Sequence, residues 1–151
     1  MIKVLFVCHG NICRSTMAEA IMKDRIKGKK LENMFYIDSA ATSREETGNP
    51  IYPPARRKLL EKGVYPGTHR ARTLTMRDYD EFDYLIGMDH ANVNNMKRMY
   101  GDPKGKIRLM MEFADINRSI SDPWYTDDFE STYQDLDLAI NAFLEKILNV
   151  K

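Results

Sequence analysis

Apolar and polar residues follow one another along the chain in blocks that predict strands and helices by turns. The first block is an apolar run interrupted only by Lys3, the pattern of a strand that is buried on both faces. Three later short segments carry the same kind of signal. The four predicted strands are 2–7, 35–39, 83–88 and 107–110.

Between these segments, apolar residues recur at intervals of three and four, which is the spacing of an amphipathic helix. The last such segment begins at Phe129 and keeps this spacing for about five turns. Glycines such as Gly28 and Gly63 mark helix ends. The predicted helices are 15–27, 55–62, 90–100 and 129–148, and the polar, proline-containing segment 40–54 is predicted to be mostly loop.

Strands that alternate with helices predict an open, mostly parallel α/β sheet with helices on both faces. In such sheets ligands bind outside the carboxyl ends of the strands, which is where the segment VCHGNICRST (7–16) falls. A length of 151 residues suits one core, and we see no internal repeat or long linker. We therefore expect a single domain over 1–151.

Composition narrows the functional classes. The net charge of +1 gives no overall field for nucleic acid or an anionic membrane, so neither is expected as a partner. Two cysteines cannot supply the disulfide framework of a small secreted protein. The first apolar run is too short for a signal peptide, and no stretch approaches a membrane span. We expect a cytoplasmic protein with reduced thiols.

The segment after the first strand has the properties of an anion-binding loop. It leads into a helix N-terminus, where backbone N–H groups lack helical partners and the helix dipole is positive. Gly10 permits a positive φ, so the loop can curl with its amides facing inward, and Asn11 tolerates the left-handed conformation. Phosphate is the expected ligand.

Cys8 and Arg14 add chemistry to this loop. A guanidinium holds two phosphate oxygens at once, and a positive site favours the thiolate form of a cysteine at its base. Such a thiolate is a nucleophile facing phosphorus, and Ser15 could donate a hydrogen bond to it. The C-x5-R spacing alone is a weak signal. The alternative is a buried Cys8 beside a solvated Arg14 at the helix start.

Expelling a phenolate requires a proton donor, and the segment DPWY (122–125) offers one in Asp122. Pro123 stiffens the segment, while Trp124 and Tyr125 could form an aromatic wall for a flat ring. The alternative is an ordinary surface turn. A structural zinc site is not expected, because there is no C-x2-C pair and the three histidines are widely spread.

These motifs together resemble the low-molecular-weight protein tyrosine phosphatase family. The resemblance spans essentially the whole chain, and its phosphate loop, V-C-x-G-N-I-C-R-S, matches here as VCHGNICRS. Further matching segments follow in the family's order: MAEA, DSAATS (38–43), GNP (48–50), HRAR (69–72), FDYLIGMD (82–89), DPW, FE and AFLEKI. The family's fold is a three-layer α/β structure, a flavodoxin-like, doubly wound, four-stranded parallel twisted sheet flanked by helices.

The resemblance implies a hydrolase that cleaves phosphotyrosine in proteins, and small aryl phosphates, without metal or other cofactor. Cys8 would form a phosphocysteine intermediate, Arg14 would bind the phosphate, and Asp122 would act as general acid and then base. The implied phosphate-binding loop is Cys8, His9, Gly10, Asn11, Ile12, Cys13, Arg14 and Ser15. The implied supporting network is Asn11, Ser15, Ser39 and His69, and the implied substrate pocket is His9, Ile12, Trp124 and Tyr125.

Cys13 matches a family position that can form a reversible disulfide with the nucleophile; the alternative is a small apolar residue packed behind the loop. His9 stands where a larger apolar residue is frequent. Ile12 favours phosphotyrosine, since relatives that act on phosphoarginine tend to carry threonine there. A phosphoarginine phosphatase or an arsenate reductase on the same scaffold is the alternative enzyme, and a flavodoxin-like anion-binding module is the non-enzyme alternative. Expected partners are phosphotyrosine-containing proteins, among them a tyrosine kinase, and inorganic phosphate as product or inhibitor.

Overall fold

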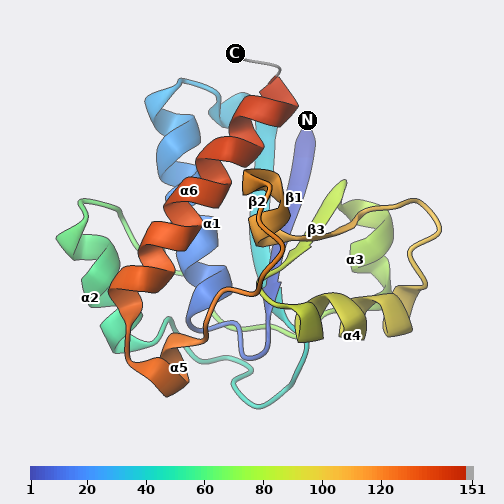
Figure 1. Ribbon diagram of the computed structural model, residues 1–151, viewed down its shortest axis with the longest axis horizontal. Coiled ribbons are helices and arrows are strands. Elements are labelled where there is room, and N and C mark those ends of the chain that lie inside the picture. Colours follow the sequence, from blue (N-terminus) through green and yellow to red (C-terminus); the bar gives the residue numbers. More distant parts are fainter. Residues whose placement is uncertain (149–151) are drawn as a thin grey trace.

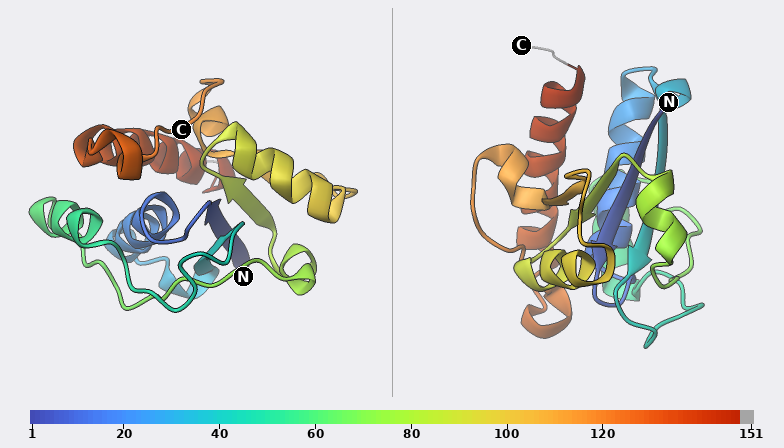
Figure 2. Two further views of the ribbon diagram at one scale, coloured as in Figure 1. Left: turned by 90° about the horizontal axis from the view of Figure 1, so that it is seen from below. Right: turned by 90° about the vertical axis from the view of Figure 1, so that its right-hand side faces the viewer.

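The four predicted strands form one sheet in which every neighbouring pair is parallel (Figures 1 and 2). The computed structural model describes residues 1–148. The strands are β1 (Ile2–Cys8), β2 (Phe35–Ala41), β3 (Tyr84–Gly87) and β4 (Ile107–Leu109), in the spatial order β2-β1-β3-β4. The predicted α/β fold with a four-stranded parallel sheet is therefore confirmed.

The helices lie between and after these strands, as the apolar spacing predicts. They are α1 (Arg14–Gly28), α2 (Pro53–Glu61), α3 (Met76–Glu81), α4 (His90–Tyr100), α5 (Pro123–Thr126) and α6 (Phe129–Leu148), with 3-10 turns η1 (Glu32–Met34) and η2 (Met110–Ala114). Within residues 1–148, no helix has both the length and the apolar character needed to cross a bilayer.

Both faces of the sheet are covered, which explains why the first strand is apolar at almost every position. Val4 and Phe6 point into a core shared with α1 and α6, while Leu5 and Val7 point into a second core shared with α3 and α4. Figure 2 shows these two pairs of helices on opposite sides of the strands. Successive strand side chains alternate between the faces, so a sheet between two helix layers requires a continuous apolar run.

The strand order places the carboxyl ends of β1 and β3 side by side. The chain leaves β1 toward β2 on one side of it, whereas β3 lies on its other side, so a crevice opens between the loops that follow β1 and β3. At this point the helix α4 approaches β3 closely. A Cβ on Gly87 would lie only 3.0 Å from the Asn92 Cβ, so a larger residue would push α4 away from the crevice.

Four helical elements are absent from the sequence prediction, and each is short: η1, α3, η2 and α5. α3 begins at a capping box in which Thr75 and Asp78 bond each other's backbone, a signal that is visible in the sequence. α5 is a single turn capped by Asp122, in the segment that the sequence predicts as a stiff loop. Such short elements carry too few apolar repeats for periodicity to detect them.

Candidate active site

The loop after β1 reaches its curled shape through Asn11. Asn11 has a φ of 59°, in the left-handed region, as expected for a short polar side chain that can bond its neighbours. The expectation that Gly10 supplies a positive φ is wrong, because Gly10 does not adopt one. A Cβ at this position would lie 3.4 Å from the Glu46 side chain, so the glycine allows Glu46 to pack closely against the loop.

The Cys8 sulfur lies at the buried base of this loop. The backbone N–H of Asn11 donates to it over 3.3 Å, and the Ser15 hydroxyl lies 3.0 Å away. Within residues 1–148, the backbone amides of Ile12, Cys13 and Arg14 donate to no protein acceptor. The loop therefore combines a thiol group, hydrogen-bond donors for its thiolate form, and free amides that can receive an anion.

The backbone N–H of Arg72 determines which groups donate and which accept in the hydrogen bonds around Cys8. The N–H of Arg72 donates to Asn11 Oδ1 over 3.1 Å, so this atom must be the amide oxygen. The amide nitrogen of Asn11 then donates to Ser15 Oγ over 2.7 Å. Because Ser15 already accepts this hydrogen bond, its own proton is free to point at Cys8. The sequence-based expectation that Ser15 donates to the thiolate fits this geometry.

The Arg14 guanidinium lies under the loop and is almost fully buried. Its Nη1 donates to Asp89 Oδ2 over 2.7 Å and to the Ile120 carbonyl over 3.0 Å, which fixes the plane of the group. Its Nε is buried and meets no hydrogen-bond partner within residues 1–148. A buried donor without a partner is costly, so this edge of the guanidinium is held ready for an anion.

Arg14 keeps its positive charge in this buried position. Burial lowers the pKa of Arg14, but the negative Cys8 sulfur and the hydrogen bond to Asp89 outweigh it and hold that pKa above its usual range. Asp89 follows β3 and caps α4, where it accepts the backbone N–H of Asn92 over 2.7 Å. The sequence-based prediction assigned no role in the site to Asp89. Its position was nevertheless visible in the sequence, because it follows a predicted strand, and ligands bind at the carboxyl ends of such strands.

Asp122 faces Arg14 from the opposite wall. Its Oδ1 accepts the backbone N–H of Trp124 over 3.0 Å as the cap of α5, and its Oδ2 lies 3.4 Å from Arg14 Nη2. One oxygen is thus tied to the backbone, while the other reaches into the pocket. The two residues are 108 positions apart in the chain, and the fold brings them together.

A pocket opens above Cys8 between two walls. One wall carries Trp124 and Tyr125 from α5, where the Trp124 ring packs on Tyr52 with ring centroids 4.8 Å apart. The other carries His9, whose Nε2 lies 2.9 Å from Glu45 Oε2. The full lining is Cys8, His9, Gly10, Ile12, Cys13, Arg14, Glu45, Glu46, Asp122, Trp124 and Tyr125. The structure thus brings together all four residues that the sequence assigns to the substrate pocket.

Of the predicted supporting residues outside the loop, His69 contacts the loop and Ser39 does not. His69 contacts the loop directly, with its Nε2 2.8 Å from Asn11 Oδ1. Ser39 does not reach the loop; its hydroxyl donates to Glu19 Oε1 over 2.6 Å, and Glu19 lies beside His69. Glu19 was absent from the sequence-based site, since a single glutamate in a predicted helix carries no signal of its own.

Cys13 differs chemically from Cys8. Its burial, followed by the nearby negative charge of Cys8, raises the pKa of the Cys13 thiol well above its usual range. Because only the thiolate is a strong nucleophile, Cys13 stays protonated and inert until strongly alkaline pH.

We expect iodoacetate at neutral pH to alkylate Cys8 and spare Cys13, as measured by peptide mass spectrometry. Inorganic phosphate should slow the reaction at Cys8, and equal labelling of both thiols in the folded protein would contradict this assignment.

Comparisons with known proteins agree with the geometry. A family model described as "Low molecular weight phosphotyrosine protein phosphatase" matches residues 3–151. The chain is 41% identical over 150 residues to the protein of that description from Gallus gallus, covering 95% of this chain and 94% of that protein.

Solved structures show the same similarity. The crystal structure of YfkJ from Bacillus subtilis is 36% identical, with a TM-score of 0.95 and coverage of 100% of this chain and 97% of that one. The structure of SP-PTP, a low molecular weight protein tyrosine phosphatase from Streptococcus pyogenes, is 39% identical, with a TM-score of 0.87. It covers 97% of this chain and 93% of that one. The similarity thus extends over the whole fold and includes the phosphate loop.

Proposed function

The chain belongs to the low molecular weight phosphotyrosine protein phosphatase family, and we propose that it hydrolyses phosphotyrosine in proteins through Cys8, Arg14 and Asp122. The observation that carries these residue roles is the Arg14 guanidinium, whose buried Nε has no hydrogen-bond partner in the described part of the chain and which lines one pocket with the Cys8 thiol. A buried guanidinium can donate two parallel hydrogen bonds to a phosphoryl group and so hold it next to a nucleophile. We further propose that 1–151 acts as one catalytic domain.

In the first step the phosphate lies against Nε and Nη2 of Arg14 and the free loop amides. The Cys8 thiolate attacks phosphorus as the bond to the tyrosine oxygen breaks. Asp122, protonated at this stage, gives its proton to the departing phenolate, whose conjugate acid has a pKa of about 10. The products of this step are the dephosphorylated tyrosine residue of the substrate protein and a phosphocysteine, with the Asp122 carboxylate now ionised.

In the second step water attacks the phosphocysteine, and the Asp122 carboxylate takes one proton from that water. The sulfur–phosphorus bond breaks and the electron pair returns to Cys8. Hydrogen bonds from the Ser15 hydroxyl and the Asn11 amide stabilise the thiolate that leaves. Inorganic phosphate is released and is expected to inhibit as a product, because it occupies the same donors.

The lining of the pocket supports phosphotyrosine as the substrate class. Cys8 is buried, so a phosphorylated side chain must enter the pocket to reach it. Ile12, Trp124 and Tyr125 line this pocket, and the two aromatic rings can pack against the ring of a tyrosine. We propose phosphotyrosine-containing proteins as partners, among them a tyrosine kinase of the same cell, and a cytoplasmic location.

The direct test is hydrolysis of phosphotyrosyl, phosphoseryl and phosphoarginyl peptides of one sequence in the presence of EDTA. We expect the phosphotyrosyl peptide to be cleaved fastest, measured as phosphate release. Faster cleavage of the phosphoarginyl peptide would favour the alternative substrate class instead. If the wild-type chain and a Cys8→Ser variant release phosphate equally slowly from all three, the proposed phosphatase activity is wrong.

The acid role of Asp122 predicts a dependence on the leaving group. In Asp122→Asn the cap of α5 is kept, but no proton is available for the phenolate. We expect turnover of phenyl phosphate to fall about 10²–10³-fold, while a nitrated phenyl phosphate, whose phenolate leaves unaided, slows much less. Asp127→Asn is the matched control, since Asp127 ends the same helix and asparagine also accepts its left-handed conformation. Equal slowing of both substrates would remove Asp122 as the acid.

A further inference from the structure

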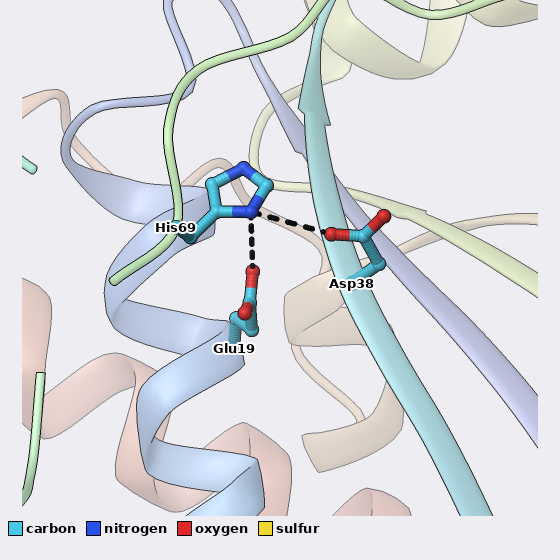
Figure 3. Close-up of side chains that lie close together, drawn as sticks. All are labelled: Glu19, Asp38 and His69. Carbon is cyan, nitrogen blue, oxygen red and sulfur yellow. Dashed lines mark ion pairs between the residues drawn. The ribbon is translucent and has the colours of Figure 1, made fainter. Parts of the chain in front are cut away.

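Glu19, Asp38 and His69 meet in a groove that shares no lining residue with the pocket above Cys8. They come from α1, from β2 and from the segment between α2 and α3, respectively. Figure 3 shows the His69 ring facing both carboxylates. His69 Nδ1 lies 3.5 Å from Glu19 Oε1 and 3.3 Å from Asp38 Oδ1, and the three atoms lie within 4.8 Å of one another.

The hydrogen bonds of the catalytic loop determine what His69 presents to these carboxylates. Asn11 Oδ1 is an acceptor because the Arg72 backbone N–H donates to it. His69 Nε2, 2.8 Å from the same oxygen, must therefore carry a hydrogen. Nδ1 is left facing two carboxylate oxygens, which are acceptors as well. The point between these three atoms thus needs a positive occupant, either a proton on Nδ1 or a metal ion.

Each of the two carboxylates has an inner oxygen, which faces His69 Nδ1, and an outer oxygen, which binds a cationic side chain. The outer oxygen of Glu19 binds Lys23 Nζ at 2.7 Å, and the outer oxygen of Asp38 accepts from Arg72 Nε over 3.2 Å. The inner oxygens are held by Ser39, whose hydroxyl donates to Glu19 over 2.6 Å and whose backbone N–H donates to Asp38 over 2.8 Å. In metal sites, hydrogen bonds of this kind from neighbouring residues orient the side chains that bind the ion.

The donor set and its spacing suit a zinc-class cation. Zinc takes imidazole nitrogen and carboxylate oxygen at about 2.0–2.2 Å in tetrahedral geometry, which separates neighbouring ligand atoms by about 3.4 Å. The two distances from Nδ1, 3.3 and 3.5 Å, bracket this separation. Because the cluster lines an open groove, water can supply the fourth ligand.

We propose that Glu19, Asp38 and His69 bind one divalent cation of the zinc class, with water as the fourth ligand. On binding, Nδ1 releases its proton to solvent and donates its lone pair to the ion, while Nε2 keeps its hydrogen bond to Asn11. The ion lies at the far end of the hydrogen-bond chain through Asn11 and Ser15 to Cys8. It takes no part in phosphoryl transfer. Its role is structural: it holds His69 in place, and His69 in turn contacts the catalytic loop through Asn11.

The test uses the full chain carrying Cys8→Ser and Cys13→Ser, because both thiols would bind zinc themselves. Calorimetric titration with Zn²⁺ alone is expected to show one equivalent bound. Asp38→Asn and Glu19→Gln should each weaken binding by about tenfold or more. Asp24→Asn is the matched control, since Asp24 lines the same groove outside the cluster and should leave the affinity unchanged. Equal affinity in the cluster variants and the control would overturn the proposal.

Nitrogen NMR of the imidazole rings tests the site without changing any proposed ligand. In the same double-serine chain, Zn²⁺ is expected to move the Nδ1 signal of His69 from the protonated to the metal-bound range. His9 and His90 serve as internal references, because both lie outside the cluster. A His69 signal unchanged at saturating zinc, or a shift confined to His9 or His90, would overturn the proposal.

Discussion

Replacing Cys8 by serine is expected to lower kcat for an aryl phosphate by about 10⁴-fold or more. A serine hydroxyl stays protonated where a cysteine in this loop can supply a thiolate, so no covalent intermediate forms. The Ser15 hydroxyl and the Asn11 amide, both within 3.3 Å of the sulfur, would then have no thiolate to stabilise. Phosphate release under saturating substrate measures the effect. Rapid-quench mass spectrometry should detect a phosphocysteine in the wild-type chain only.

The same variant provides its own control for folding. Arg14 and the loop amides are untouched in Cys8→Ser, so inorganic phosphate should still bind and raise the melting temperature. This separates loss of the nucleophile from loss of the site. Residual turnover within tenfold of the wild type, with the phosphate effect intact, would show that another group attacks phosphorus.

Replacing Arg14 by lysine is expected to lower kcat/KM by about 10³-fold or more, although the charge is kept. Lysine lacks the planar fork, so it cannot present two parallel donors to the phosphate. It also cannot make both Nη1 contacts, to Asp89 and to the Ile120 carbonyl, that set the plane of the group. The partly buried Asp89 carboxylate would keep a weaker partner.

Steady-state kinetics and the affinity for inorganic phosphate together measure this effect. We expect kcat to fall as well as KM to rise, because the guanidinium meets charge that grows in the transition state. Arg70→Lys is the matched control, since Arg70 is exposed and its guanidinium donates to the Gly48 carbonyl, outside the catalytic pocket. A rise in KM with kcat unchanged would mean that Arg14 only holds the substrate.

Part of the fold follows from the sequence because its causes are local. The first strand was predicted from one apolar run, which reflects a sheet covered on both faces. The helix 90–100 was predicted with the bounds that the structure has, since it starts after Asp89 and ends at Gly101, which adopts a positive φ. The single turn α5 was not predicted, because four residues carry no periodicity.

The order of the strands could not be predicted by periodicity, because pairing depends on contacts between distant segments. That order decides which loops share the crevice, and so explains why Asp89 stands beside Arg14 from 75 residues away. In the sequence Asp89 is one acid among many. Its contact with the guanidinium is visible only when β3 lies against β1.

The sequence by itself determined the phosphate loop, because Cys8, Arg14 and Ser15 lie within one strand-to-helix connection whose shape depends on the left-handed backbone of Asn11. The tertiary structure alone decided how the groups of the site meet. It set which nitrogen of His69 carries a hydrogen, which edge of Arg14 stays free, and which acids meet at Glu19 and Asp38. Hydrogen-bond direction and charge pairing depend on atoms within a few ångströms, and packing brings those atoms together from remote parts of the chain.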